Sequence, residues 1–436
     1  MAIPYCKILQ LCLGLSLIFH NFSLANPFIV DDHRQGHQNN NNLSTKLIRL
    51  TSPLFVFGDS LFDPGNNNYI DTNPNFWSNF LPYGETHFEI ATGRFSNGRI
   101  IPDFIAKYAN LPLIPPYFQS GYKQFSYGVN FASGGAGALV ETHQGKVSCY
   151  RWQDVKDHLL FLRLDIDAVS RTILITSIIC YFSIFNISSH VIIIRSLQAI
   201  SLKEQMMYFK DVEKQLRKRI GDRETQELLS NAVYMFDIGV NDLSEPDPMY
   251  RNFTSQDYID IIVANFTDVL KEVYKAGGRK FVLLNLLPLD CTPCARAQNN
   301  AEKLAELVNQ FNEALSREFK KLEKQLNGFL YSEFDFFTAV NDRIQNPSRY
   351  GFKEVRNACC GSGIYRGNYS CGGKRDGECD YELCDNPQDY FFFDCHHPSE
   401  KAYEQIAELM WNGPPSMVGQ YNLKSLFEIQ SRELAL

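Results

Sequence analysis

The residues of this sequence that could perform nucleophilic chemistry begin with a serine at the end of an apolar run. In LFVFGDSLFDPGNNN, Ser60 follows the strand-like residues Leu54 to Phe57 and precedes a stretch rich in turn-forming residues. A serine hydroxyl is a weak nucleophile, because it needs a base to take its proton, usually a histidine that a carboxylate orients. The rest of the chain must therefore supply a histidine and a carboxylate.

The motif FFFDCHHPSEKAYEQIAELM supplies both groups. Asp394 and His397 are spaced so that one loop can hold them, with the carboxylate accepting the Nδ1 proton while Nε2 faces the serine. His396 is the rival base, but its spacing from the aspartate and the position of Pro398 favour His397. Alone, the motif would also fit a solvated loop histidine. Together with the other motifs it predicts a catalytic triad.

Two further motifs could stabilise the oxyanion that forms when a serine attacks an ester carbonyl. NFASGGAGAL offers the backbone N–H of Gly134 as first choice and that of Gly135 as the alternative, and MFDIGVNDL offers the side-chain amide of Asn241. The backbone N–H of Ser60 would complete the oxyanion hole, in which each donor is worth ~3 kcal/mol of the barrier. The glycine motif could instead be a tight turn or a phosphate cradle, but it lacks the lysine of a phosphate-binding loop.

Four short apolar runs must position these motifs: Leu54 to Phe57, Tyr127 to Ala132, Ala232 to Ile238 and Phe281 to Leu286. Helical patterns separate them, the clearest from Lys303 to Leu326. Strands that alternate with helices predict a mostly parallel sheet covered on both faces. Functional residues of such folds lie at the carboxyl ends of the strands, where these motifs occur.

Composition excludes one class of partner. The chain has 436 residues, 44% of them hydrophobic, so it can bury a substantial core. Its net charge of -7, with no Lys/Arg-rich run, argues against binding to nucleic acid.

The N-terminus predicts export. Lys7, the apolar residues Ile8 to Phe19 and the small-residue ending at Ala25 are typical of a secretory signal over residues 1–25. The alternative is a membrane anchor, but the run is short for a bilayer core of ~30 Å. Residues 26–50 indicate a flexible leader, and we expect no obligate membrane partner.

The cysteines outside the signal and outside an anomalous segment described below form an even set: Cys291, Cys294, Cys359, Cys360, Cys371, Cys379, Cys384 and Cys395. Such a set in an exported chain predicts disulfides, in which the vicinal Cys359 and Cys360 each pair elsewhere. No second C-x-x-C accompanies Cys291 and Cys294, so we expect no metal. Sequons at Asn42, Asn186, Asn252, Asn265 and Asn368 fit a secreted glycoprotein.

One segment, residues 147–200, breaks the pattern. Within it, Thr172 to Ile194 holds nine isoleucines in 23 residues and no Asp, Glu, Lys, Arg, Gly or Ala, before a helical stripe resumes from Leu202 to Ile220. It could be a transmembrane helix or a genuine subdomain. We favour a retained intron, because Ile, Phe, Tyr, Asn and Ser are what AT-rich noncoding sequence encodes.

In chain order, FVFGDSLFDPGNNN, NFASGGAG, IGVNDL and FFFDCHHP resemble the conserved blocks of the plant GDSL esterase/lipase family within the SGNH hydrolases. PYGETHFEIATGRFSNGRIIPDFIA further resembles the GDSL lipase subgroup associated with secretion and defence. The resemblance covers residues 51–146 and 201–415, and it departs at 147–200, where the family has a short junction. It implies one hydrolase domain over 51–425 with a three-layer α/β/α fold and a flavodoxin-like, mostly parallel sheet.

Carried over to this sequence, the resemblance implies Ser60 as nucleophile, Asp394 and His397 as its triad partners, and Gly134 and Asn241 as oxyanion donors. It further implies an extracellular carboxylic-ester hydrolase of the apoplast or cell wall that works through an acyl-enzyme without a cofactor. Its substrate would be a small-molecule, lipid or polysaccharide ester. Alternatives are acyl transfer, polysaccharide deacetylation, or an inactive binding protein if residues 147–200 disturb the glycine motif.

Overall fold

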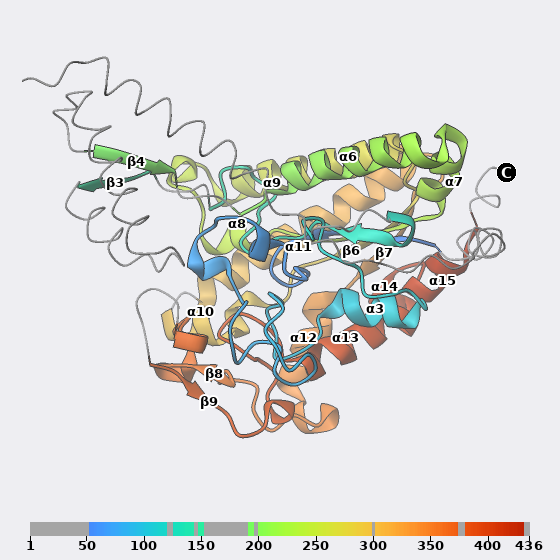
Figure 1. Ribbon diagram of the computed structural model, residues 1–436. Coiled ribbons are helices and arrows are strands. Elements are labelled where there is room, and N and C mark those ends of the chain that lie inside the picture. The colour runs from blue at the N-terminus through green and yellow to red at the C-terminus, as the bar shows by residue number, and fades with distance from the viewer. Residues whose placement is uncertain are drawn as a thin grey trace, which may run out of the picture. The chain divides into compact units, whose positions relative to one another are not determined.

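The computed structural model describes residues 52–119, 125–143, 199–298, 301–373 and 380–430, and the backbone of 147–151 and 191–195 (Figure 1). The predicted signal over 1–25, the leader over 26–50 and most of the segment 147–200 lie outside the described residues. Within that segment, the backbones of β3 (Val147–Arg151) and β4 (Val191–Arg195) form an antiparallel pair. Among the described helices, none has both the length and the apolar character needed to cross a membrane.

A parallel sheet of five strands, in the order β2-β1-β5-β6-β7, forms the centre of the fold. Its strands are β1 (Leu54–Gly58), β2 (Gly128–Asn130), β5 (Val233–Asp237), β6 (Lys280–Leu284) and β7 (Leu330–Phe334). The first four coincide with the four apolar runs of the sequence, and every pairing is parallel. This order is that of a flavodoxin-like sheet, as expected.

The fifth strand, β7, was not predicted from the sequence. Its residues LYSEF lie at the edge of the sheet and are alternately half-buried and buried, whereas β1, β5 and β6 are buried throughout. An edge strand that begins soon after a long helix gives a weak apolar signal, because one of its faces is only partly covered.

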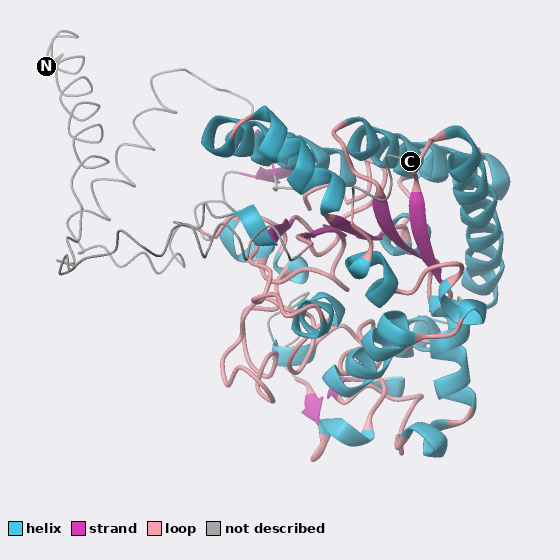
Figure 2. Ribbon diagram, turned by 90° about the vertical axis from the view of Figure 1, so that its right-hand side faces the viewer, coloured by secondary structure: helices cyan, strands magenta, loops and turns pink. Residues whose placement is uncertain are grey.

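Helices cover both faces of the sheet, which confirms the three-layer architecture (Figures 1 and 2). One layer contains α6 (Leu202–Ile220), α7 (Asp222–Asn231), α9 (Ser255–Lys275) and α11 (Ala301–Gln325). The other contains α3 (Ile101–Tyr108), α12 (Phe336–Gln345), α13 (Glu400–Asn412), α14 (Pro415–Val418) and α15 (Leu423–Glu428). Two short helices, α8 (Val240–Ser244) and α10 (Pro293–Gln298), lie in loops that follow strands.

Stacked aromatic rings fill the core around β1. Phe57 stacks on Phe236 of β5 with ring centroids 4.6 Å apart, and Phe55 stacks on Tyr234 at 5.5 Å. Strand β1 then ends at Gly58, where a Cβ atom would lie 2.5 Å from the Asp237 carbonyl oxygen. Only glycine allows β1 and β5 to approach so closely at the carboxyl edge, immediately before Ser60.

Described residues from before and after most of the segment 147–200 are hydrogen-bonded to each other. The Leu202 N–H donates to the Gly137 carbonyl at 3.0 Å, and the Ile200 N–H donates to Ser133 Oγ at 3.0 Å. Ala199 and Ile200, which the sequence analysis placed in the anomalous segment, are buried. Packed structure therefore resumes at residue 199, next to the glycine motif.

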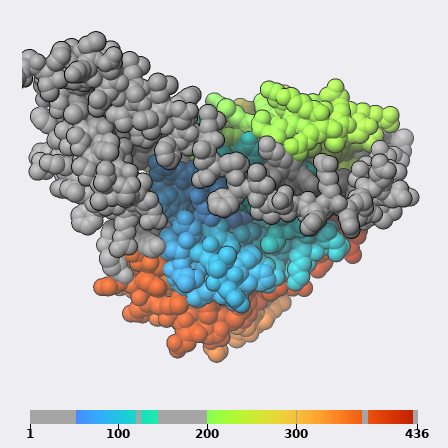
Figure 3. Space-filling view, in the orientation of Figure 1, coloured from blue at the N-terminus to red at the C-terminus, as the bar shows by residue number. Residues whose placement is uncertain are grey.

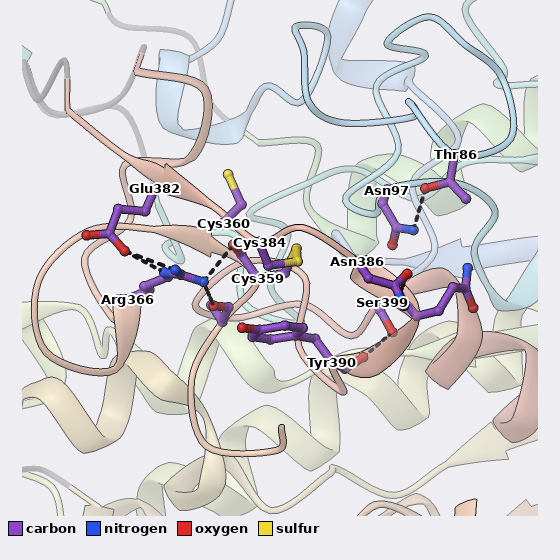
Figure 4. Close-up of a disulfide and its surroundings, with 12 residues drawn as sticks. Thr86, Asn97, Cys359, Cys360, Arg366, Glu382, Cys384, Asn386, Tyr390 and Ser399 are labelled. Carbon is purple, nitrogen blue, oxygen red and sulfur yellow. Dashed lines mark hydrogen bonds and ion pairs between the residues drawn. A yellow bond between two sulfur atoms is a disulfide. The ribbon is translucent and has the colours of Figure 1, made fainter. Parts of the chain in front are cut away.

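Two disulfides, Cys359–Cys384 and Cys360–Cys371, stabilise the loop region that contains β8 (Cys360–Gly361) and β9 (Glu382–Leu383). The vicinal cysteines thus pair with different partners, which confirms the expectation for them. Arg366 and Glu382 form an ion pair beside the Cys359–Cys384 disulfide, with an N–O distance of 2.9 Å (Figure 4). The Cys360 N–H donates to the Phe393 carbonyl at 2.7 Å, so this region supports the loop that starts at Asp394.

Candidate active site

Ser60, His397 and Asp394 form a continuous hydrogen-bonded chain, although 337 residues separate the serine from the histidine. His397 Nε2 lies 2.8 Å from Ser60 Oγ, and His397 Nδ1 lies 2.8 Å from both carboxylate oxygens of Asp394. Asp394 and His397 are buried, and Ser60 is partly exposed. The space-filling view shows surface from the N-terminal part of the domain, in blue, directly against surface from its C-terminal part, in orange (Figure 3).

The loop 394–397 is held by its own aspartate. Asp394 Oδ1 accepts the backbone N–H groups of His396 and His397, each at 2.8 Å, which closes a tight turn around the carboxylate. The imidazole of His397 packs on the ring of Phe95, with centroids 4.7 Å apart. These contacts hold the imidazole in the orientation that directs Nε2 at the serine.

Tyr83 is a further member of the site that the sequence reasoning missed. Its ring is fully buried, and its hydroxyl donates to Asp394 Oδ2 at 2.7 Å. Tyr83 lies in the motif PYGETHF, far from every strand that was predicted, so only the folded chain brings it to the aspartate. The Tyr83 hydroxyl thus bonds to Oδ2, whereas the backbone N–H groups of His396 and His397 bond to Oδ1.

Tyr83→Phe is expected to lower kcat for ester hydrolysis roughly tenfold while KM stays within about twofold, because a hydrogen bond to a charged group contributes about 1.5–3 kcal/mol. Steady-state kinetics would measure this split. Tyr274→Phe is the matched control, since its hydroxyl donates to the Asn327 carbonyl at 2.8 Å outside the site. Equal effects of the two substitutions would show that Tyr83 contributes only to stability.

The rival base, His396, points elsewhere. Its ring packs edge-on against Tyr369, with centroids 5.0 Å apart, and its nitrogen lies near the sulfur atoms of Cys294 and Cys395. Within the described residues, the histidine that the structure places in hydrogen-bond contact with Ser60 Oγ is His397.

The geometry changes the choice between the two glycines of the glycine motif. The Gly134 N–H, our first choice from the sequence, donates to Asp63 Oδ2 at 2.9 Å, so this proton is directed into the loop after β1. The Gly135 N–H makes no hydrogen bond within the described part of the chain. Gly135 has φ +83°, a left-handed conformation that favours glycine. The alternative, Gly135, therefore fits the role of donor better.

Asn241 lies at the start of α8, directly after β5. Its amide donates to the Ala136 carbonyl at 2.8 Å and, over a longer distance of 3.4 Å, to Asp59 Oδ2. Because the hydrogen bond to Asp59 is long, a ligand oxygen could compete with this carboxylate for the amide. The Ala136 contact fixes the amide next to the glycine motif.

The turn-forming residues that follow Ser60 support the glycine motif. Asp63 accepts the Gly134 N–H, and the Asn67 amide donates to the Gly134 carbonyl at 3.0 Å. The Asn66 amide donates to the Ala132 carbonyl at 2.8 Å. The polar stretch therefore connects the loop after β1 to the loop after β2, a contact that the sequence reasoning did not anticipate.

Asp59, beside the nucleophile, supports the loop and is not the carboxylate that contacts histidine. It is buried and accepts the Leu61 N–H at 3.0 Å. Burial raises the pKa of Asp59 to about 7, and nearby carboxylates add to this effect. Burial, together with Asp59, also raises the pKa of Asp237 well above its usual range. Two acidic groups thus lie beneath the site in an environment that favours their neutral forms.

Comparisons with known proteins show what this chain is similar to. The family model of GDSL-like lipases/acylhydrolases matches residues 54–410. The chain is 44% identical over 402 residues to GDSL esterase/lipase 1 of Arabidopsis thaliana, covering 89% of this chain and 92% of that protein. It is 42% identical over 379 residues to a GDSL lipase of Tanacetum cinerariifolium, covering 86% and 87%. A more distant relative, 28% identical over 387 residues and covering 87% and 75%, is an inactive GDSL esterase/lipase-like protein of A. thaliana.

Proposed function

Because this chain belongs to the GDSL-like lipase/acylhydrolase family, we propose that it is a secreted carboxylic-ester hydrolase whose triad is Ser60, His397 and Asp394. The observation that carries the proposal is the 2.8 Å contact between His397 Nε2 and Ser60 Oγ, with Nδ1 held by Asp394. The two disulfides and the N-terminal sequence support export.

The proposed reaction has two halves. His397 takes the proton of Ser60 as Oγ attacks the ester carbonyl, and the resulting oxyanion accepts hydrogen bonds from the N–H groups of Ser60 and Gly135 and the amide of Asn241. His397 then gives its proton to the leaving alcohol, which leaves an acyl group on Ser60. In the second half, His397 activates a water molecule that releases the acid.

Asn241→Ala is expected to reduce kcat roughly 10²- to 10³-fold, because loss of one oxyanion donor has effects of this size in other enzymes. Steady-state hydrolysis of a p-nitrophenyl ester is the measurement. Asn309→Ala, at an exposed position of α11, is the matched control and should behave as wild type. A decrease of less than about threefold in Asn241→Ala would remove this residue from the oxyanion hole.

Several relatives are named esterase/lipase, and on the basis of these names we propose small-molecule or lipid esters as the substrates. Transfer of the acyl group to an alcohol, or deacetylation of a polysaccharide, would use the same residues with a different acceptor or acyl group. Product analysis with competing alcohols distinguishes hydrolysis from transfer.

The test of the proposed function combines turnover with covalent labelling. Purified mature protein should hydrolyse short- and medium-chain p-nitrophenyl esters, and a fluorophosphonate should stop the reaction by adding a single phosphonyl group to Ser60. Peptide mass spectrometry locates the label. Absence of turnover and of label at Ser60 in folded protein would refute the assignment.

A variant that lacks residues 147–198 is expected to keep or exceed the ester hydrolysis of the full mature chain. Described residues that precede and follow the deleted segment are hydrogen-bonded to each other, since the Leu202 N–H donates to the Gly137 carbonyl and the Ile200 N–H to Ser133 Oγ. A short linker from residue 146 to 199 would therefore leave the glycine motif in place. If only the full chain were active, the segment would be part of the enzyme and the retained-intron hypothesis would be wrong.

A further inference from the structure

Three side chains that the proposed mechanism does not use lie beside the triad loop. The sulfur atoms of Cys294 and Cys395 and a ring nitrogen of His396 are within 4.8 Å of one another. Cys395 directly follows Asp394, whereas Cys294 belongs to α10, about a hundred residues earlier in the chain. The cluster therefore joins the triad loop to a separate element.

The backbones at the two cysteines are already paired. The Cys294 N–H donates to the Cys395 carbonyl at 3.1 Å, and both side chains are buried, with exposed fractions of 7% and 0%. A disulfide requires a sulfur–sulfur distance of about 2.05 Å. The two sulfur atoms lie within 4.8 Å of each other and the backbones are hydrogen-bonded, so closing the bond would require the sulfur atoms to approach by side-chain rotation.

The environment of Cys294 favours the thiolate. Its sulfur accepts hydrogen bonds from the Cys395 thiol and from Gln298 Nε2, the latter at 3.2 Å. The hydrogen bond with Cys395, followed by the charge of His396, lowers the pKa of Cys294 to about 5 despite burial. Cys291, one turn earlier, shows the opposite behaviour, since burial raises the pKa of its thiol to about 11. Cys294 is thus suited to attack a disulfide, and Cys291 is not.

We propose that Cys294 and Cys395 are the site of a third disulfide, which ties α10 to the loop that carries Asp394 and His397 and positions that loop for catalysis. The two cysteines belong to neither of the disulfides already described.

The bond forms by thiol–disulfide exchange with a small-molecule disulfide such as oxidised glutathione. The Cys294 thiolate attacks one sulfur of the oxidant, whose S–S bond breaks and releases one glutathione thiolate. Cys395 then loses its proton to solvent and attacks Cys294 Sγ, which forms the protein disulfide and releases the second glutathione thiolate. Two protein thiols are oxidised, and the oxidant is reduced to two thiols.

Peptide mapping of the full mature chain tests the proposal without reference to activity. Protein equilibrated with oxidised glutathione is denatured in N-ethylmaleimide, digested without reductant and analysed by mass spectrometry. A linked peptide that contains Cys294 and Cys395 is expected, and it should persist in Cys291→Ser. Recovery of both cysteines as maleimide adducts would overturn the proposal. This holds also if the folded protein retains a bound zinc ion.

The positioning role rests on the proposed function and has its own readout. In Cys294→Ser we expect kcat to fall roughly tenfold with little change in KM, because a small displacement of the triad loop weakens the chemical step. Cys291→Ser should retain wild-type kcat. An unchanged kcat in Cys294→Ser would overturn the positioning role. A linked peptide in a protein with no ester turnover would instead refute the proposed function and leave the disulfide standing.

Discussion

Ser60→Ala is expected to reduce kcat for ester hydrolysis roughly 10⁶-fold, the size of effect seen when the nucleophile of another serine hydrolase is removed. The hydroxyl is the atom that His397 Nε2 contacts at 2.8 Å. Burst and steady-state kinetics with p-nitrophenyl esters measure the loss. Because Ser60 is partly exposed, the loss of one oxygen leaves no cavity in the core.

Folding of the Ser60→Ala protein must be checked alongside activity. Thermal unfolding should give a midpoint close to that of wild type, and Ser230→Ala provides the matched control. Ser230 belongs to α7, and its hydroxyl donates to the Glu227 carbonyl at 3.1 Å. Residual turnover at the wild-type level in pure Ser60→Ala protein would eliminate the serine mechanism.

His397→Ala is expected to cause a loss of similar size, roughly 10⁶-fold, whereas His396→Ala should keep kcat within about tenfold of wild type. The two histidines are adjacent in sequence, but only His397 connects Ser60 to Asp394 through its ring. His396 contacts Asp394 through its backbone N–H, which alanine retains. The two variants therefore compare the same substitution at neighbouring positions.

The measurement for this pair is kcat with and without added imidazole. Imidazole should partly restore turnover in His397→Ala, because the deleted ring leaves a space between Ser60 and Asp394, and it should have no effect on His396→Ala. Greater loss in His396→Ala than in His397→Ala would reverse the assignment of the base.

The motifs and their order were enough to predict the class of fold and to select the members of the candidate triad. Four apolar runs, each ending in a polar or glycine-rich motif, predicted the strands of a mostly parallel sheet, and the sheet order confirms these strands. Ser60, Asp394 and His397 could be chosen because their motifs contain local information: the end of a strand, and the spacing that lets one loop hold a carboxylate and an imidazole.

Contacts between distant segments could not be predicted from the sequence. Tyr83 reaches Asp394 across 311 residues, and the pairing of Cys294 with Cys395 depends on where α10 packs. No local pattern encodes such contacts, because they arise from the packing of whole elements.

The choice between Gly134 and Gly135 as oxyanion donor also could not be made from the sequence. Both glycines occur in a single motif, so composition and spacing cannot separate them. The carboxylate of Asp63, from the loop after another strand, accepts the Gly134 N–H and leaves that of Gly135 open. The direction of a backbone N–H and the acceptor that it reaches depend on the conformation of the loop and on residues elsewhere in the chain, and both are properties of the folded protein.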